Sequence, residues 1–142
     1  MAKIYVGCAL TGAPQEFVDK VELLKALLRE EGYEVPDFLG LVKGTAQDVY
    51  EVDIWQRVAE CDLLVAICDV PSIGLGWEMA TAVEKRRKPV LAVAHKDTRI
   101  TRLIIGAEGE RNPLYRFRRY DKIEDVVGMT CDTLTVLSGD MV

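Results

Sequence analysis

The sequence predicts an α/β protein in three layers, with helices on both faces of a parallel sheet. Short apolar runs of strand length alternate with amphipathic helical segments along the 142 residues, which is the pattern of successive βαβ units. Two of these runs, at residues 62–70 and 89–95, are apolar at nearly every position, as expected for strands covered on both faces. No repeat, linker or low-complexity segment divides the chain, so we expect one domain over residues 1–142.

The chain begins with a predicted strand and a long helix. Residues 3–10 form a short apolar run that ends in a turn. Residues 14–35 then carry apolar side chains at spacings of three and four, which indicates an amphipathic helix. Gly32 is a fitting end for that helix.

A weaker strand and a second helix follow. Residues 33–39 predict a strand at the sheet edge, because the proline among them cannot donate to a central ladder. Residues 48–61 predict a helix that is capped by Asp48 and turns Trp55 and Val58 toward the core.

The second half continues the alternation. Strands and helices alternate, beginning with a strand, at residues 62–70, 76–88, 89–95, 100–107, 114–120 and 122–137. Five strands joined in this way favour a five-stranded, flavodoxin-like (Rossmann-like) sheet in the order 2-1-3-4-5.

Composition excludes several classes of protein. The net charge is −5 with acids and bases intermixed, which argues against a nucleic-acid polymer as partner, and the basic runs 84–88 and 116–120 are typical of solvated element ends. No signal peptide is visible and no apolar stretch approaches the roughly 20 residues of a membrane span, so no membrane partner is expected. Four scattered cysteines and one histidine predict reduced thiols, a cytoplasmic location and no metal site, and no cofactor is implied.

A ligand is expected beyond the carboxyl ends of the strands, near the point where strand order reverses. Three segments meet there: residues 8–14, 69–76 and 94–101. The second holds the sequence PSIGLG, whose Gly74 and Gly76 allow close backbone approach, while the following helix offers unpaired N–H groups to an anion. Its spacing matches neither the dinucleotide fingerprint nor the P-loop.

Glu78 follows this loop, in the first turn of the expected helix. An acid there is often only a favourable partner of the helix dipole. Its apolar neighbours and the adjacent buried strand nevertheless indicate that it points into the cleft, and its place near the helix start should keep it ionised. An ionised carboxylate suits the nucleophile of glycosyl transfer.

Other polar residues accompany Glu78. Asp53 is the candidate second acid, because Asp is a poor mid-helix residue and its neighbours are apolar; a solvent-facing Asp is the alternative. Tyr5 lies in the first strand, where a buried phenol needs a partner, although packing alone also explains it. Asp69 is a further polar group, whereas Cys8 shows no sign of thiolate activation and His95 is read as a loop histidine.

Three segments together resemble the nucleoside 2-deoxyribosyltransferase superfamily, and most closely its branch of 2′-deoxynucleoside 5′-phosphate N-hydrolases. They are KIYVGCALTG, the run from VYEVDIWQ through PSIGLGWE to KPVLAV, and ITRLIIGAEG. The resemblance implies an enzyme that cleaves N-glycosidic bonds without a cofactor. Glu78 falls on the family nucleophile, Asp53 on the acid that assists the leaving base, and Tyr5 on the tyrosine that positions the nucleophile.

The resemblance also bears on the substrate. Transferases of free nucleosides carry an acidic residue at the position of Ser72. An acid there would repel a phosphate, whereas a serine can donate a hydrogen bond to one. Thr101 falls on a hydroxyl residue that reaches the phosphate site of a second subunit, which implies a homodimer. Ala9 and Thr11 stand where the hydrolases have a serine and an arginine that contact phosphate, and Lys43, Arg99 or Arg102 are candidates to compensate.

The expected function is hydrolysis of the N-glycosidic bond of 2′-deoxynucleoside 5′-monophosphates through a covalent glycosyl-Glu78 intermediate. The alternatives are base exchange on free deoxynucleosides and a non-catalytic nucleotide-binding module. The predicted catalytic residues are Glu78, Asp53 and Tyr5, and the predicted substrate-binding residues are Ser72, Gly74, Gly76, Gly7, Ala9, Thr11, Asp69 and Thr101.

Overall fold

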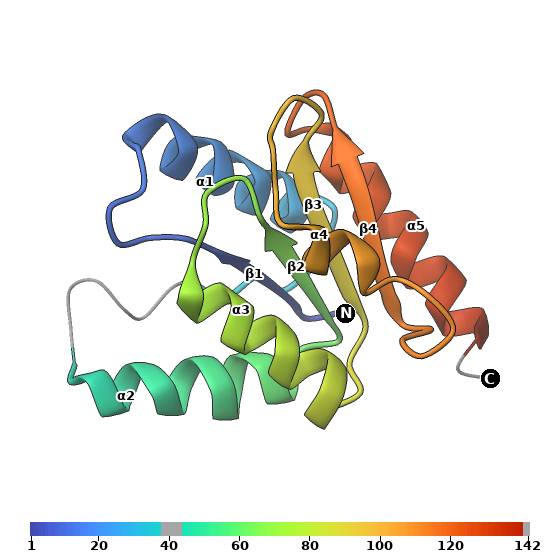
Figure 1. The fold of residues 1–142 in the computed structure, drawn as a ribbon, viewed down its shortest axis with the longest axis horizontal. Coiled ribbons are helices and arrows are strands. Elements are labelled where there is room, and N and C mark those ends of the chain that lie inside the picture. Colours follow the sequence, from blue (N-terminus) through green and yellow to red (C-terminus); the bar gives the residue numbers. More distant parts are fainter. Residues whose placement is uncertain (38–43, 141–142) are drawn as a thin grey trace.

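A computed structural model describes residues 1–37 and 44–140 of the chain. The sheet in this part of the chain has four parallel strands in the order β1-β2-β3-β4. The strands are β1 (Ile4–Cys8), β2 (Leu63–Ile67), β3 (Val90–His95) and β4 (Tyr115–Tyr120). Figure 1 shows their carboxyl ends together at one edge of the sheet.

The expected five strands in the order 2-1-3-4-5 are not confirmed. Within the described residues, the segment predicted as the second strand forms only an isolated parallel bridge, between Glu34 and Lys3 beside β1. Charged side chains hold this segment to the first helix instead: Arg29 donates to the Val35 carbonyl and Lys25 to Asp37. Residues 38 and 39 of the predicted strand lie outside the described residues.

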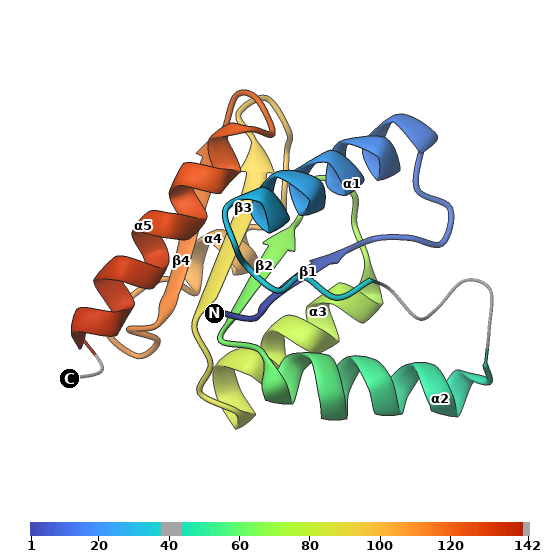
Figure 2. The same cartoon turned by 180° about the vertical axis from the view of Figure 1, so that it is seen from behind.

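Helices cover both faces of the sheet. Figures 1 and 2 show α1 (Gln15–Glu30) and α5 (Asp125–Asp140) along one face, and α2 (Ala46–Tyr50) and α3 (Ile73–Ala80) along the other. Alternate residues of β1 divide between the two hydrophobic clusters: Ile4 and Val6 pack under α1 and α5, while Tyr5 packs under α3. Gly32, with φ +96°, follows α1 as predicted.

The helix that contains Asp53 begins earlier than predicted. Thr45, not Asp48, is the capping residue: its hydroxyl accepts from the Asp48 N–H, while the Asp48 carboxylate accepts from the Thr45 N–H. α2 continues directly into the π-helical segment η1 (Glu51–Val58). In η1 the core positions are Ile54 and Val58, so the prediction that Trp55 faces the core is wrong; 43% of its surface is exposed.

α3 also begins earlier than predicted, at Ile73. The Ser72 hydroxyl accepts from the Leu75 N–H and caps the helix, so Gly74 and Gly76 are helical residues rather than parts of a loop. Glu78 therefore lies in the second turn, away from the unpaired N–H groups of the helix start. α3 runs into η2 (Thr81–Lys85), and the short helix α4 (Arg102–Gly106) lies between β3 and β4 in sequence.

All four cysteines of the chain are free. Within the described ranges, no helix has both the length and the apolar character needed to cross a bilayer.

Candidate active site

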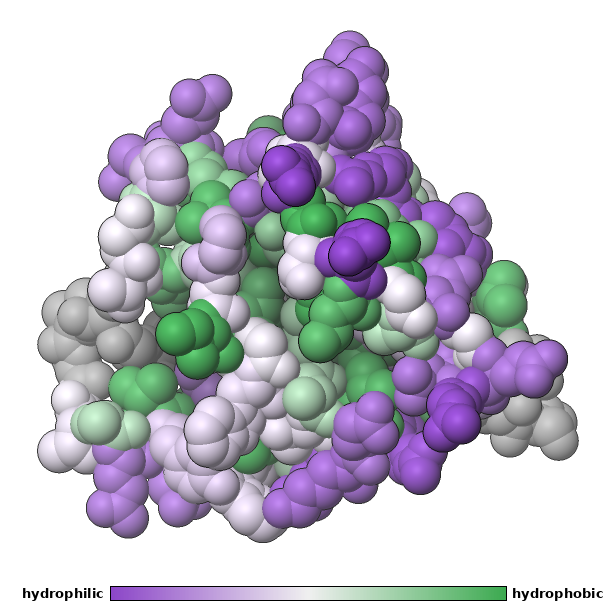
Figure 3. Space-filling view, viewed as in Figure 1, coloured by the Kyte–Doolittle hydropathy of each residue, from purple (hydrophilic) through white to green (hydrophobic). Residues whose placement is uncertain are grey.

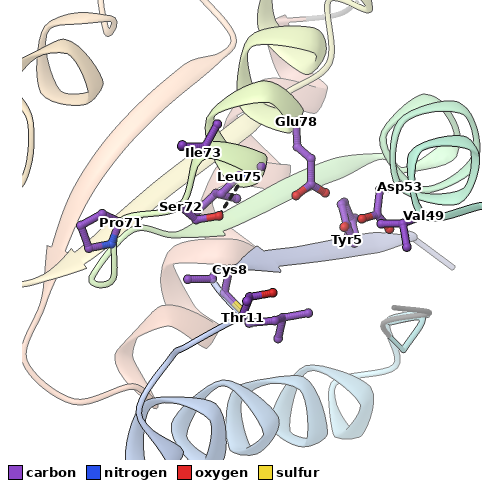
Figure 4. Close-up of a pocket in the computed structure, with 13 residues that line it drawn as sticks. Tyr5, Cys8, Thr11, Val49, Asp53, Pro71, Ser72, Ile73, Leu75 and Glu78 are labelled. Carbon is purple, nitrogen blue, oxygen red and sulfur yellow. Dashed lines mark hydrogen bonds between the residues drawn. The ribbon is translucent and has the colours of Figure 1, made fainter. Parts of the chain in front are cut away.

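A cavity of about 460 Å³ opens beyond the carboxyl end of β1, under the start of α3. Its walls come from β1 and the turn after it, from α2 and η1, and from the β2–α3 loop with α3 (Figure 4). The lining residues are Tyr5, Cys8, Ala9, Leu10, Thr11, Val49, Asp53, Pro71, Ser72, Ile73, Gly74, Leu75 and Glu78. The structure thus brings the three predicted catalytic residues to one cavity.

Glu78 is buried, with 7% of its surface exposed. It shares the inward face of its helix with Leu75, Met79 and Ala82, which pack on the sheet. Its Oε2 atom is buried and has no hydrogen-bond partner among the described residues. Burial raises the pKa of Glu78 to about 8; a hydrogen bond from Tyr5 lowers it, and the Asp53 charge raises it. The expectation that Glu78 stays ionised because of the helix start is therefore wrong.

Tyr5 projects from β1 toward Glu78, with 3% of its surface exposed. Burial and the charges of Glu78 and Asp53 raise the pKa of its phenol, as does its hydrogen bond to Glu78. The phenol therefore stays protonated and serves as a hydrogen-bond donor. A donor at this place holds the Glu78 carboxylate and favours its ionised form.

Asp53 approaches the same point from η1. Its side chain is partly buried, and burial raises its pKa while Arg57 lowers it. A π-helical turn is rare and often marks a functional site, because it shifts side chains out of the regular helical register. Figure 4 shows the carboxylates of Asp53 and Glu78 converging on Tyr5 from two helices.

Cys8 lines the cavity wall below Glu78. Burial, and then the charge of Glu78, raise the pKa of its thiol to about 12. The thiol is therefore protonated at neutral pH and is no nucleophile. Among the described residues, no group of three or more His, Cys, Asp or Glu is arranged to hold a metal ion.

The start of α3 forms the opposite wall. Ser72, Ile73 and Gly74 line the cavity there, and Ala9 and Thr11 line it from the turn after β1. The described lining residues include no lysine or arginine. A helix N-terminus and two hydroxyl groups are nevertheless suited to an anion, because unpaired N–H groups and the helix dipole favour negative charge.

A second cavity, of about 350 Å³, lies on the other side of the β2–α3 loop and shares Pro71, Ser72, Ile73 and Leu75 with the first. Gly76, Arg99 and Thr101 line this second cavity. Thr101 also caps α4, because its hydroxyl accepts from the Leu103 N–H. Figure 3 shows apolar side chains around a hollow in the region where α3 and α4 lie in Figure 1.

The remaining predicted residues lie elsewhere. Asp69 is not among the residues that line either cavity. Gly7 is a packing position, since a Cβ there would lie 2.9 Å from the Leu75 Cδ1 atom. Of the candidates for charge compensation, Arg102 lines neither cavity and Lys43 lies outside the described residues.

Apolar lining residues were not predicted, among them Leu10, Val49 and Ile73. Val49 carried a usable signal, because it precedes Asp53 by four residues and so shares its helix face. Leu10 and Ile73 carried none, since an apolar residue beside a turn is equally compatible with packing.

No protein-family model matches the chain. A Thermofilum pendens protein named "Putative 2′-deoxynucleoside 5′-phosphate N-hydrolase 1" is 31% identical over 134 residues, which cover 88% of this chain and 90% of that protein. A protein of the same name from Syntrophotalea carbinolica is 38% identical over 98 residues, 67% of this chain and 63% of its own length. The solved structure of the Clostridium botulinum CMP N-glycosidase BcmB covers 90% of this chain and 96% of its own, at 20% identity and a TM-score of 0.70, and shares the fold.

These comparisons identify the class of enzyme: the chain is an N-glycoside hydrolase with a parallel α/β fold. Within that class, its similarity to the Thermofilum protein over most of both sequences shows that the chain belongs to the family of 2′-deoxynucleoside 5′-phosphate N-hydrolases. The resemblance seen in the sequence motifs is thereby confirmed.

Proposed function

We propose that this enzyme hydrolyses 2′-deoxynucleoside 5′-monophosphates to free base and deoxyribose 5-phosphate through a glycosyl-Glu78 intermediate. One observation carries the proposal: the Glu78 carboxylate is buried, its Oε2 has no partner among the described residues, and it faces a cavity that it shares with Asp53 and Tyr5. Burial of a carboxylate oxygen without a partner is unfavourable for stability. A role as nucleophile toward the anomeric carbon accounts for such an oxygen in this cavity.

The reaction proceeds in two displacements. In the first, a Glu78 carboxylate oxygen forms a bond to C1′, the C1′–N bond breaks, and the base leaves with a proton from Asp53. In the second, Asp53 takes a proton from water, whose oxygen bonds to C1′ and releases Glu78. Asp53 loses a proton in the first displacement and regains one in the second, so Asp53 and Glu78 return to their starting protonation states.

The pair of acids must hold one proton for the first step. Burial raises the pKa of both carboxyl groups, and the Asp53 charge further raises that of Glu78, so a charge on Asp53 favours the protonated form of Glu78. The reactive form places the proton on Asp53 and the charge on Glu78. The hydrogen bond from Tyr5, which lowers the pKa of Glu78, favours this form.

The phosphate is proposed to lie at the start of α3. The Ser72 hydroxyl accepts from the Leu75 N–H and still has its own proton to donate. The N–H groups of Ile73 and Gly74 belong to the first helical turn beside it. Thr11 faces this wall from the turn after β1 and is the second candidate hydroxyl.

The test is a panel of deoxynucleoside 5′-monophosphates, the matching ribonucleotides and the free deoxynucleosides, with base release followed by chromatography. We expect release of base from at least one deoxynucleoside monophosphate, and a slower reaction with its free nucleoside, which lacks the phosphate contacts. A second base added to the reaction would give an exchanged product if the enzyme were a transferase. Binding without turnover of any compound would instead support a nucleotide-binding module.

The enzyme is also proposed to be a homodimer, as the family resemblance implied. Ile73, Trp77 and Leu103 of α3 and α4 expose 93%, 62% and 73% of their surfaces. Ile73 lines one surface hollow together with Trp77, and the second cavity together with Thr101. Exposed apolar side chains that cluster on one face are typical of an interface. Light scattering should give twice the mass of the chain, and Leu103→Glu should give monomers; a wild-type monomer at micromolar concentration would contradict this.

A further inference from the structure

A buried polar cluster lies at the carboxyl edge of the sheet, outside both cavities, with Asp69 at its centre. The Asp69 side chain is 8% exposed. Its Oδ2 atom accepts from the Tyr120 hydroxyl at 2.8 Å and from the His95 backbone N–H at 3.2 Å, and lies 3.6 Å from the Lys20 ammonium. One carboxylate oxygen thus joins the end of β2 to β3, β4 and α1.

The neighbours of Asp69 also hold one another. The Lys20 ammonium lies 5.0 Å from the centre of the Tyr120 ring. The His95 and Tyr120 rings contact each other edge to face, with their centres 5.6 Å apart. Tyr120 is 1% exposed. A ring fixed from two sides keeps its hydroxyl aimed at Asp69, so the carboxylate receives a preformed set of donors.

This cluster is the anchor of the loop that leads to α3. The backbone of β2 remains paired as far as Cys68, whose N–H donates to the Val93 carbonyl. No backbone hydrogen bond joins residues 69–71 to another described residue, and the next backbone bond is inside α3, from Gly76 to Ser72. Pro71 restricts the backbone of the loop but has no N–H group with which to bond it to another element. Among the described residues, Val70 packs on the core, and the Asp69 side chain makes the polar contacts that fix where the loop leaves the sheet.

The arrangement is costly. The other carboxylate oxygen, Oδ1, is buried and has no partner among the described residues. Leaving a charged oxygen unpaired away from water is unfavourable, so the three contacts on Oδ2 must offset this cost. An apolar side chain at this place would avoid the cost but could not fix the loop to three other elements.

We infer that Asp69 is a positioning residue for phosphate recognition: it holds the β2–α3 loop so that Ser72 and the first N–H groups of α3 point at the 5′-phosphate. This inference rests on the proposed function. Ser72 lies three residues after Asp69 in the loop. Glu78 lies farther along α3, which Leu75 and Met79 pack independently onto the sheet. Loosening the loop therefore weakens phosphate binding more than it slows the attack by Glu78.

The experiment uses Asp69→Ala, Asp69→Asn and Tyr120→Phe, with Tyr33→Phe as matched control. Tyr33→Phe also removes a side-chain hydrogen bond, to the Cys131 sulfur, but Tyr33 adjoins Glu34, which pairs at the amino end of β1, opposite the sheet edge that the loop leaves. The probe is deoxyribose 5-phosphate, the product common to all deoxynucleoside monophosphate substrates, titrated by calorimetry. KM and kcat are measured with the monophosphate that the wild type hydrolyses fastest.

Tyr120→Phe is expected to weaken binding of deoxyribose 5-phosphate and to raise KM about three- to tenfold, the range for the loss of one typical hydrogen bond, with kcat changed less than twofold. Asp69→Ala should have a larger effect, and Asp69→Asn, which keeps an acceptor for Tyr120, a smaller one. If Asp69→Ala bound deoxyribose 5-phosphate as tightly as the wild type, or if Tyr33→Phe lost as much affinity as Tyr120→Phe, this inference would be overturned and the proposed function would stand. A wild type that neither hydrolyses monophosphates nor binds the product would overturn the proposed function and this inference with it.

Discussion

Glu78→Gln is expected to reduce base release by a factor on the order of 10³ or more, because it removes the nucleophile and closes the covalent route. Glutamine has nearly the same volume as glutamate, so Leu75 and Met79 can keep their packing on the sheet. Binding of deoxyribose 5-phosphate should remain, since the proposed phosphate contacts lie at the start of α3. Single-turnover kinetics and calorimetry would separate the two effects.

The covalent step has its own readout. Acid-quenched wild-type enzyme should carry a deoxyribosyl phosphate on the peptide that contains Glu78, and Glu78→Gln should carry none, as mass spectrometry can determine. Glu84→Gln is the matched control, because Glu84 lies on the continuation of the same helix with an exposed side chain. Full activity of Glu78→Gln would disprove the proposed mechanism.

Periodicity predicted most of the fold, and it was wrong where local capping decided the structure. The buried strands β2 and β3 and the helix α1 follow directly from apolar runs and spacing. The pattern predicts too late a start for α3, because two glycines argue against a helix, whereas in the structure the Ser72 cap offsets their cost. The expected second strand is not confirmed: within the described residues this segment pairs beside β1 only at Glu34, and Arg29 and Lys25 hold Val35 and Asp37 to α1.

The site was predictable where chemistry and periodicity agree. Glu78 stands at a core-facing helical position, and an acid in such a place is rarely structural. The charge state of Glu78 was not predictable, since its pKa depends on the burial of its side chain between α3 and the sheet and on Asp53, which is distant in sequence. Asp69 could not be separated from the cavity residues either, because its partners Tyr120 and Lys20 come from elements at opposite ends of the chain.

The charge on Glu78 also makes stability depend on pH. Its pKa is about 8 in the folded protein and 4.5 in an ordinary environment. Between these values the folded protein holds a proton that the unfolded chain releases, so stability falls as pH rises through this range. Below about pH 4.5 the contribution is complete, and above about pH 8 it is lost. At about 1.4 kcal/mol for each pKa unit, the loss is on the order of 3–5 kcal/mol.

Glu78→Gln cannot ionise, so we expect it to be more stable than the wild type at pH 9, by roughly 3–5 kcal/mol in the free energy of unfolding, and about equal to it at pH 4.5. Urea unfolding of both proteins across this range measures the difference, with Glu84→Gln expected to follow the wild type. The same proton is needed by the acid pair for the first chemical step, so kcat/KM of the wild type should fall along an alkaline limb near pH 8. Stability should therefore fall between about pH 4.5 and pH 8, and activity should fall from about pH 8 upward. If the free energies of unfolding of Glu78→Gln and the wild type changed with pH in parallel, burial would not raise the pKa of Glu78. There would then be no reason to expect the alkaline limb.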